Sequence, residues 1–290
     1  MIALSAVLFA RSPARIALAW FVGLCTLLVP WLAPVDALFP RGLLALASML
    51  PALRLIDLAR DRRAWSAPHR VWQFLSPFDA REAVRATPRL DLGSVGSGLL
   101  QSGIFAAMLV VFRELPYFAG ESWTGAVRVA AGVVAIYTLM GAGSAITSAF
   151  YRGIGLEFPP MQRTPIASRT LREFWGERWN RTINRWLRRN CFNPLARRSW
   201  PRLGIFVAFA ASALIHVWLM FAPLGGTMAL LMGSYFVVEG VLLITEGWIR
   251  VRRWPEPLQR AWTILAVVGP SPLFMVPMTI LLSPTPSPLG

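Results

Sequence analysis

The sequence predicts an all-α, polytopic membrane protein, and three observations support this fold class. Of the 290 residues, 56% are hydrophobic and only 15% are charged, whereas soluble domains average roughly 45–50% and 25%. Several stretches reach the roughly 20 apolar residues that cross a bilayer as a helix. Most of the charged residues lie between these stretches rather than within them. A single water-soluble core cannot absorb so much apolar sequence.

Seven apolar stretches are the candidate spans of one integral membrane domain. Residues 1–150 hold four of them, residues 151–202 form an arginine-rich segment, and residues 203–282 hold the other three. The second stretch is the weakest, because Pro51 and Arg54 interrupt it. The first has no convincing cleavage site behind it, so we interpret it as an uncleaved helix rather than a signal peptide. The predicted spans are residues 16–33, 42–58, 95–113, 124–150, 203–222, 227–249 and 261–282.

The loops between these spans test the count independently, because positive charge marks the cytoplasmic side of a membrane. All 29 basic residues are arginine, and arginine-rich and arginine-poor loops alternate strictly. Residues 59–94 carry seven arginines and residues 151–202 carry twelve, whereas residues 114–123 carry none. This alternation predicts an amino terminus in the cytoplasm and a carboxyl terminus outside. We expect the inner membrane of a bacterium.

The arginine-rich segment, residues 151–202, is patterned beyond a plain linker. Apolar residues recur at steps of three and four residues, which predicts one face of a helix: Trp175, Trp179, Ile183 and Trp186 or Leu187. The arginines lie mostly off this face. Such a distribution is typical of an amphipathic or re-entrant helix at the membrane interface or in a groove between spans. A solvated basic loop with anchoring tryptophans is the alternative.

His216 is the candidate for chemistry within the membrane. It lies thirteen residues into the stretch 203–222, about 20 Å along a helix axis. Titratable groups at that depth are costly and tend to be functional. A neutral imidazole in a dry site can take a proton from a hydroxyl and return it, which is general-base catalysis. The alternative is a histidine that donates to a backbone carbonyl in helix packing. The second histidine, His69, lies in a loop and is assigned no role.

Two glutamates and one asparagine are further candidates. Glu239 falls near the middle of the stretch 227–249, where its burial requires a partner, a wet cavity or protonation. Glu246 lies close to the arginine-rich end and has Arg250 as an i+4 neighbour, so a simple ion pair is the alternative to a functional role. Asn180 offers one carbonyl acceptor and two N–H donors. It could hold a substrate carbonyl or stabilise oxyanion charge, or equally lie on a helix surface.

Residues 157–180 resemble the signature of the wax synthase-like branch of the membrane-bound O-acyltransferase family. That branch carries Ser-Leu-(Arg/Gln)-(Asp/Glu)-Phe-Trp-Gly-x-Arg-Trp-(Asn/His) after a proline-containing lead, and its end is matched position by position by Phe174-Trp175-Gly176-Glu177-Arg178-Trp179-Asn180. The family's later Phe-x-x-Ser-Gly-(Leu)-x-His stretch is similar to Ala211-Ser212-Ala213-Leu214-Ile215-His216, with Ala213 in place of the usual glycine. A further family segment resembles Phe236 to Gly240 and Glu246-Gly247-Trp248. The resemblance covers roughly residues 157–277.

This resemblance implies a membrane-bound O-acyltransferase fold and a matching activity. Such a transferase moves a fatty acyl group from a thioester, usually acyl-CoA, to the hydroxyl of a lipophilic acceptor such as a long-chain alcohol, as in wax ester synthesis. Carried over to this chain, His216 is the base on the alcohol and Asn180 is the second polar catalytic residue. Substrate-binding roles are expected for Trp175, Arg178, Trp179, Glu239 and Glu246.

The expected partners are acyl-CoA as a co-substrate, a lipophilic alcohol and the lipid bilayer, without a bound cofactor. No metal is expected: one membrane histidine cannot build a histidine-rich site, and a mixed carboxylate site, though possible, has no support in the sequence. Cys25 and Cys191 are too isolated for a disulfide framework. The net charge of +15 comes from arginines in the loops, where they can contact anionic lipid headgroups. No nucleic-acid-binding motif accompanies these arginines, so nucleic acid is not an expected partner. The sequence leaves the oligomeric state open.

The predicted topology puts the motif on the cytoplasmic side and His216 beyond the middle of the bilayer. We therefore expect the motif helix to dip into the membrane and a tunnel to join a cytoplasmic donor to the histidine. A rival hypothesis is a transporter or lipid flippase that uses Glu239 and His216 as a proton relay. The related halves with broken helices that transporters often carry are not found in the sequence. A membrane scaffold without activity is the third hypothesis.

Overall fold

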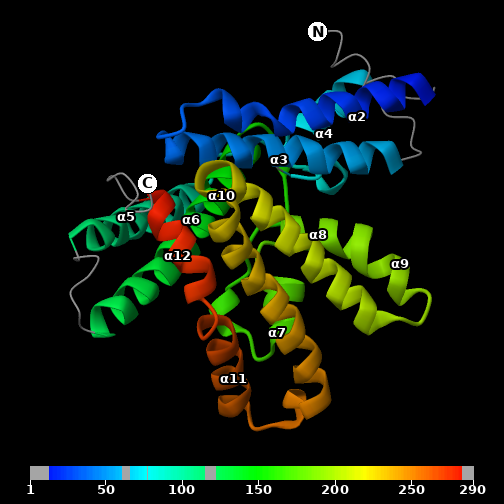
Figure 1. Ribbon diagram of the computed structural model, residues 1–290. Coiled ribbons are helices and arrows are strands. Elements are labelled where there is room, and N and C mark those ends of the chain that lie inside the picture. Colours follow the sequence, from blue (N-terminus) through cyan, green and yellow to red (C-terminus); the bar gives the residue numbers. More distant parts are fainter. Residues whose placement is uncertain (1–12, 61–65, 77, 115–121, 283–290) are drawn as a thin grey trace. The chain divides into compact units, whose positions relative to one another are not determined.

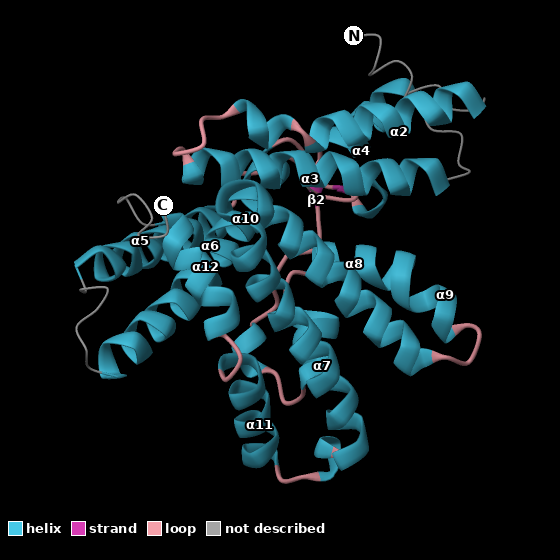
Figure 2. Ribbon diagram, viewed as in Figure 1, coloured by secondary structure: helices cyan, strands magenta, loops and turns pink. Residues whose placement is uncertain are grey.

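The computed structural model describes residues 13–60, 66–76, 78–114 and 122–282. Within these ranges the chain is helical except for loops and one pair of short strands (Figure 1; Figure 2). The chain divides into two compact units, of which the first comprises residues 1–83 and 218–229, and the second residues 84–217 and 230–290. The all-α character is thus confirmed, whereas the single membrane domain stays a prediction.

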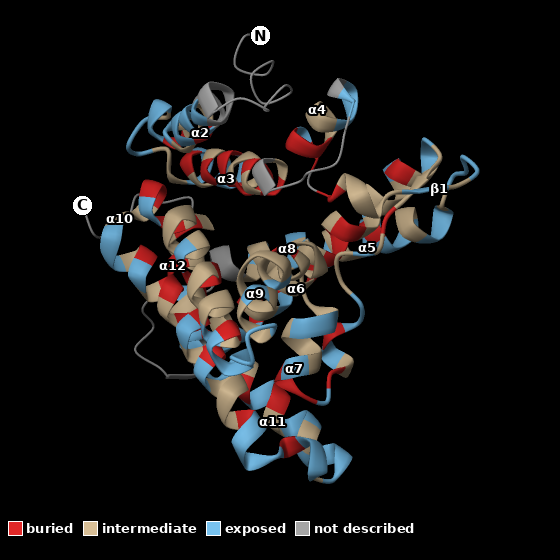
Figure 3. Ribbon diagram, turned by 90° about the vertical axis from the view of Figure 1, so that its right-hand side faces the viewer, coloured by how far each residue is buried: buried red, intermediate tan, exposed pale blue. Residues whose placement is uncertain are grey.

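The first unit is built around α3, Leu38–Arg60, which packs against α2, Pro13–Leu27, and α4, Ala67–Leu75. Buried residues line much of α3 (red in Figure 3), and Leu55 of α3 packs on Phe74 of α4. The unit also contains two 3₁₀ turns, η1 at Val29–Leu32 and η2 at Ala80–Glu82.

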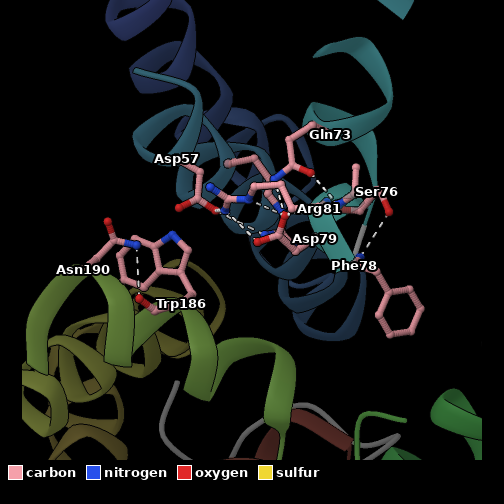
Figure 4. A network of polar contacts seen from close by, with 10 residues as sticks. Asp57, Gln73, Ser76, Phe78, Asp79, Arg81, Trp186 and Asn190 are labelled. Carbon is pink, nitrogen blue, oxygen red and sulfur yellow. Dashed lines mark hydrogen bonds and ion pairs between the residues drawn. The ribbon is translucent and has the colours of Figure 1, made fainter. Parts of the chain in front are cut away.

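A buried network of charges explains why α3 can carry an arginine. Arg54 and Asp57 are both 3% exposed and form an ion pair of 3.3 Å. Arg81 reaches Asp57 at 3.0 Å and Asp79 at 2.6 Å, and the amide of Gln73 donates to Asp79 at 3.3 Å (Figure 4). Each buried charge in this network therefore has an opposite partner, as buried charges require.

Replacing Asp57 by asparagine is expected to destabilise the protein by about 3 kcal/mol, because breaking a buried ion pair leaves uncompensated charge. Arg54 and Arg81 both lose a partner in this variant. Unfolding of the purified protein in detergent measures the effect. Asp36→Asn, which removes an exposed carboxylate, is the matched control and is expected to change nothing. Equal stability of the two variants would contradict the role given to the network.

The second unit begins with a helical hairpin of α5, Leu92–Glu114, and α6, Ser122–Gly153. The two helices pack closely in antiparallel order, because Gly98 lies against Ile146 and Gly141 against Gln101. Small residues let helix backbones approach each other in a membrane. Where the hairpin opens, β1 (Val84–Arg85) pairs antiparallel with β2 (Leu156–Glu157).

Asp91 ties the two ends of this hairpin together. Its carboxylate accepts the backbone N–H and the hydroxyl of Ser94, at 3.0 and 2.8 Å, and so caps the start of α5. Arg152, at the end of α6, forms ion pairs with both Asp91 and Glu157. The Ser94 hydrogen bonds and the Arg152 guanidinium lower the pKa of Asp91 from 3.8 to about 2.

Because the pKa of Asp91 is lower in the folded protein than in the unfolded chain, its ionised form stabilises the fold. This stabilisation is complete above about pH 4 and is lost as the pH falls through about 2. Asp91→Asn keeps a good helix cap but loses the ion pair with Arg152. We expect the variant to melt at a lower temperature at pH 7 and to lose the wild-type dependence on pH between 4 and 2. Parallel melting profiles across that window would contradict this expectation.

The longest helical run, α10 at Pro201–Ile249, is two helices joined at Gly225, whose φ of 76° breaks the helix. The second half returns along the first (Figure 1), with Gly233 against Val217 and Gly240 against Phe209. A Cβ on Gly240 would lie 2.8 Å from that of Phe209, so glycine is what permits this close packing. The run is followed by η6 at Val251–Arg253, α11 at Glu256–Val268 and α12 at Pro272–Leu282.

Among the described residues, four helices are long and apolar enough to cross a membrane, and they lie in α3, α5, α6 and α10. A fifth results if α11 and α12, bent by 47°, are one span. The protein thus has several membrane-type helices, but seven spans are not confirmed. The two halves of α10 coincide with the separately predicted spans 203–222 and 227–249. The first predicted span, 16–33, is not one helix: α2 ends at Leu27, and Pro30, which lacks an N–H, lies in η1.

The arginine-rich segment forms short helical pieces instead of the continuous helix that the tryptophan spacing predicted. Trp179 is extended, with ψ of 136°, and Asn180 is left-handed, with φ of 34°, so the helical path breaks between them. The prediction of one helix face from Trp175 to Trp186 is therefore wrong. The pieces are η3 at Pro165–Ala167, α7 at Leu171–Glu173, the π-helical turns η4 at Phe174–Arg178 and η5 at Arg188–Phe192, α8 at Arg181–Leu187 and α9 at Asn193–Ala196.

Candidate active site

His216 lies on the first half of α10 with its imidazole against an aromatic ring. The ring stacks on Phe236 of the second half, with centroids 3.8 Å apart and planes inclined by 24°, and Phe274 of α12 lies edge-on at 6.0 Å. Its Nδ1 is 2.7 Å from the backbone carbonyl of Ser212. A carbonyl only accepts, so Nδ1 carries the proton, and Nε2 of the neutral ring is left as an acceptor.

The carbonyl contact expected of a packing histidine is therefore present, and it has a chemical consequence. It fixes the tautomer in which Nε2 is the only atom of His216 that can take a proton. The hydrogen bond also holds the ring in one orientation, as the partner of the second nitrogen commonly does for histidines that act on substrates. Packing and general-base roles do not exclude each other at this position.

The motif reaches this ring cluster through Trp175. Its indole Nε1 donates to the carboxylate of Glu239 at 2.8 Å, and its ring lies 6.1 Å from Phe236 and 6.3 Å from Tyr235. Glu239 is fully buried, and its Oε1 has no hydrogen-bond donor among the described residues. Phe236 thus contacts both His216 and the first tryptophan of the motif. Of the three alternatives for a buried Glu239, a partner, a wet cavity or protonation, the structure shows a partner, Trp175.

Glu246 also binds the motif and does not pair with Arg250 among the described residues. Its carboxylate accepts the backbone N–H groups of Leu171 and Arg172, at 2.6 and 3.2 Å, and the indole N–H of Trp262, at 3.2 Å. The alternative of an ion pair with Arg250 is not found, because Arg250 ends α10 in a left-handed conformation, with φ of 54°, and so leaves the helical i+4 geometry. Both oxygens of Glu246 already accept from protein groups. A substrate-binding role for it stays a prediction.

Asn180 occupies a junction between two helical pieces. Its left-handed backbone, φ 34° and ψ 58°, starts α8, and its Oδ1 accepts the N–H of Ile183 at 3.4 Å. The carbonyl of its side chain is therefore engaged, whereas its two amide N–H groups donate to no group in the described part of the chain. No hydrogen bond joins Asn180 to His216 within the described residues. Trp179, the neighbour of Asn180 in the chain, lies 6.5 Å from Trp175, and the Trp175 ring in turn lies beside Phe236.

Arg178 and Trp179 hold the motif in shape. Arg178 pairs with Glu173 at 2.6 Å and donates to the carbonyls of Arg163 and Thr164, at 3.1 and 3.3 Å. Burial alone would raise the pKa of Glu173, but the Arg169 N–H and the Arg178 guanidinium outweigh it and lower that pKa.

The ring of Trp179 stacks on Phe174 at 5.6 Å and lies 6.4 Å from Tyr137 of α6. Since Trp179 and Arg178 both make structural contacts, their substrate-binding roles stay predictions. His69, to which no role was assigned, is exposed and contacts Ser66.

The sequence did not assign a role to Tyr235, Phe274 or the carbonyl of Ser212, and it named Phe236 only as part of a resemblance. Tyr235 and Phe236 precede Glu239 by four and three residues, so they share its helix face. That spacing could have identified them as neighbours of the glutamate. Within the described residues, no three His, Cys, Asp or Glu side chains converge as a metal site would require.

Comparison with known proteins gives a consistent picture. Residues 158–237 match the membrane bound O-acyl transferase family. Two proteins of Arabidopsis thaliana, named probable long-chain-alcohol O-fatty-acyltransferases 9 and 3, are 30% and 28% identical over 124 and 145 residues. The long-chain-alcohol O-fatty-acyltransferase of Simmondsia chinensis is 28% identical over 116 residues.

These alignments cover 40%, 43% and 34% of this chain but only 36%, 41% and 33% of the three relatives. The chain therefore spans little more than a third of the length of the curated relatives it matches. The stretch that matches the family, residues 158–237, contains the motif, His216 and Phe236. The resemblance inferred from the motif is confirmed: in this stretch the chain is similar to the membrane bound O-acyl transferase family and to long-chain-alcohol O-fatty-acyltransferases.

Proposed function

We propose that this chain is a membrane-bound O-acyltransferase. It moves a fatty acyl group from acyl-CoA to the hydroxyl of a lipophilic acceptor such as a long-chain alcohol. The observation that carries the proposal is the tautomer of His216: Nδ1 donates to the Ser212 carbonyl at 2.7 Å, and Nε2 is left to accept a proton. The family match and the names of the relatives support acyl transfer over other uses of a membrane histidine.

In the proposed reaction the alcohol O–H donates to Nε2 of His216. The alcohol oxygen attacks the thioester carbonyl carbon as its proton passes to the imidazole, and the carbonyl oxygen gains negative charge. The N–H donors of Asn180 stabilise that charge. The C–S bond then breaks, the ester is released, and the thiolate takes the proton back from the imidazolium. Proton transfer of this kind contributes typically 10²–10⁴-fold to the rate.

The apolar surroundings of His216 favour an alcohol over water as the acceptor. The imidazole contacts Phe236 and Phe274, and such rings offer water no hydrogen-bond partners. On the cytoplasmic side of a bacterial inner membrane, the arginine-rich segment would attract the phosphates of the CoA donor, because guanidinium binds phosphate bidentately. An amino terminus in the cytoplasm is part of this proposal.

The decisive experiment incubates membranes that carry this chain with labelled acyl-CoA and a panel of alcohols, sterols and glycerides. Chromatography then identifies the labelled ester. We expect an ester of a long-chain alcohol that membranes without the chain do not form. Lipid or proton transport without any ester would favour the transporter hypothesis. The absence of both activities would favour a scaffold, and either outcome overturns the proposal.

A further inference from the structure

The second half of α10 presents two glutamates to the motif. Glu239 and Glu246 are seven residues apart, so they lie on one face of the helix and about 10.5 Å from each other along its axis. Both bind the segment that runs from Leu171 to Trp175. Two points of attachment fix the orientation of a segment, whereas one would let it pivot.

The two attachments differ in kind. Glu246 accepts the N–H groups of Leu171 and Arg172, which start the short helix α7 and would otherwise have no partner within it. Glu239 binds a side chain, the indole of Trp175, at 2.8 Å. The first attachment therefore anchors the backbone of the motif. The second sets where the tryptophan ring lies against Phe236.

Burying the carboxyl group of Glu239 costs free energy, and the need to fill space in the core does not explain why a glutamate is found here. It is 0% exposed, and Oε1 meets no hydrogen-bond donor among the described residues. The Tyr235 hydroxyl donates to the Val267 carbonyl at 3.3 Å, and it also interacts electrostatically with the Glu239 carboxyl group. A buried polar atom left without a partner costs about 1–3 kcal/mol. An apolar residue would avoid that cost, so the polar groups around Glu239 must explain it, and among them the Trp175 indole makes a hydrogen bond of 2.8 Å.

We propose that Glu239 and Glu246 form a two-point clamp that positions the motif beside His216, with Glu239 acting through Trp175 and Phe236 on the imidazole. Glu239 is thus a positioning residue, in place of the substrate-binding role expected from the sequence. The inference rests on the proposed acyltransferase function. It follows from three contacts: the Trp175 indole N–H with the Glu239 carboxylate, the Trp175 ring with Phe236, and Phe236 with the imidazole.

The test compares two substitutions of Glu239 with one of Trp175. Glu239→Gln retains a carbonyl oxygen that accepts the indole N–H, whereas Glu239→Met fills the space and removes the acceptor. Trp175→Phe keeps an aromatic ring and removes the donor. We expect Glu239→Met and Trp175→Phe each to lower kcat about tenfold with the KM for acyl-CoA unchanged, and Glu239→Gln to retain near-wild-type kcat.

The double variant Glu239→Met/Trp175→Phe measures whether the effects of the two substitutions on kcat are coupled. If the two residues act through one hydrogen bond, the double variant loses little more than either single variant. The clamp is overturned if the losses multiply, or if Glu239→Gln is as poor as Glu239→Met with a raised KM, as a carboxylate that binds substrate would give.

A readout independent of activity separates failure of the clamp from failure of the proposed function. The ¹⁵N-labelled indole resonance of Trp175, identified by its absence in Trp175→Phe, is expected to shift in Glu239→Met and to stay near its wild-type position in Glu239→Gln. A wild-type protein that makes no ester but shows this pattern retains the clamp and refutes the acyltransferase. An unchanged resonance in Glu239→Met refutes the clamp.

Discussion

Replacing His216 by alanine is expected to lower ester formation by about 10²–10⁴-fold, the range that general-base catalysis contributes. The variant removes Nε2, the atom that would take the proton of the alcohol, while the backbone of α10 remains intact. His216 stacks on Phe236 at 3.8 Å, so some stability is lost with the ring. Purified protein in detergent, labelled acyl-CoA and chromatography of the ester measure the activity. Size exclusion and thermal melting measure folding.

Two control variants separate the base from its surroundings. Ser212→Ala removes a hydroxyl but keeps the backbone carbonyl that accepts from His216 Nδ1, so it is expected to retain activity close to that of the wild type. His69→Ala removes the other histidine, which is exposed, and is expected to be neutral. A folded His216→Ala variant that keeps more than about a tenth of wild-type activity would contradict the assignment of His216 as the base.

The membrane helices were predictable where an apolar run is long and uninterrupted. The spans predicted at 95–113 and 124–150 fall within α5 and α6, Leu92–Glu114 and Ser122–Gly153. In such runs, hydropathy and length alone determine that a helix forms. The first predicted span was less accurate, because α2 ends at Leu27. Hydropathy does not take account of Pro30, which lacks a backbone N–H and lies in η1.

The candidate site was predictable as a set of residues but not as an arrangement. His216 stood out because it is a polar residue in an apolar run, and the motif stood out by resemblance. The partners could not be read from sequence distance: Trp175 and Glu239 are 64 residues apart, and Leu171 and Glu246 are 75 apart. Only the return of α10 on itself brings Phe236 to His216. Local rules instead suggested Arg250 as the partner of Glu246, which the helix end prevents.

At Asn180 a structural role and a catalytic role can be tested separately, because helix capping and the proposed oxyanion stabilisation use different atoms of its side chain. Oδ1 caps α8 through Ile183, whereas the amide N–H groups are the donors proposed for the oxyanion. Asn180→Asp keeps an acceptor for the cap and a residue that tolerates the left-handed backbone, but loses both donors. We expect a folded protein in which kcat falls about 10²–10³-fold, the range seen when one side chain that stabilises an oxyanion is removed.

Two companion variants test whether activity follows the donors or the fold. Asn180→Gly suits the φ of 34° and costs only a few tenths of a kcal/mol as a cap, so it is expected to be as inactive as Asn180→Asp and nearly as stable as the wild type. Asn180→Ala adds left-handed strain and loses the cap, which together cost about 2 kcal/mol. If all three variants lose activity equally while only Asn180→Ala melts early, the donors carry the effect. If activity instead falls only where the melting temperature falls, Asn180 is a structural cap and other residues stabilise the oxyanion.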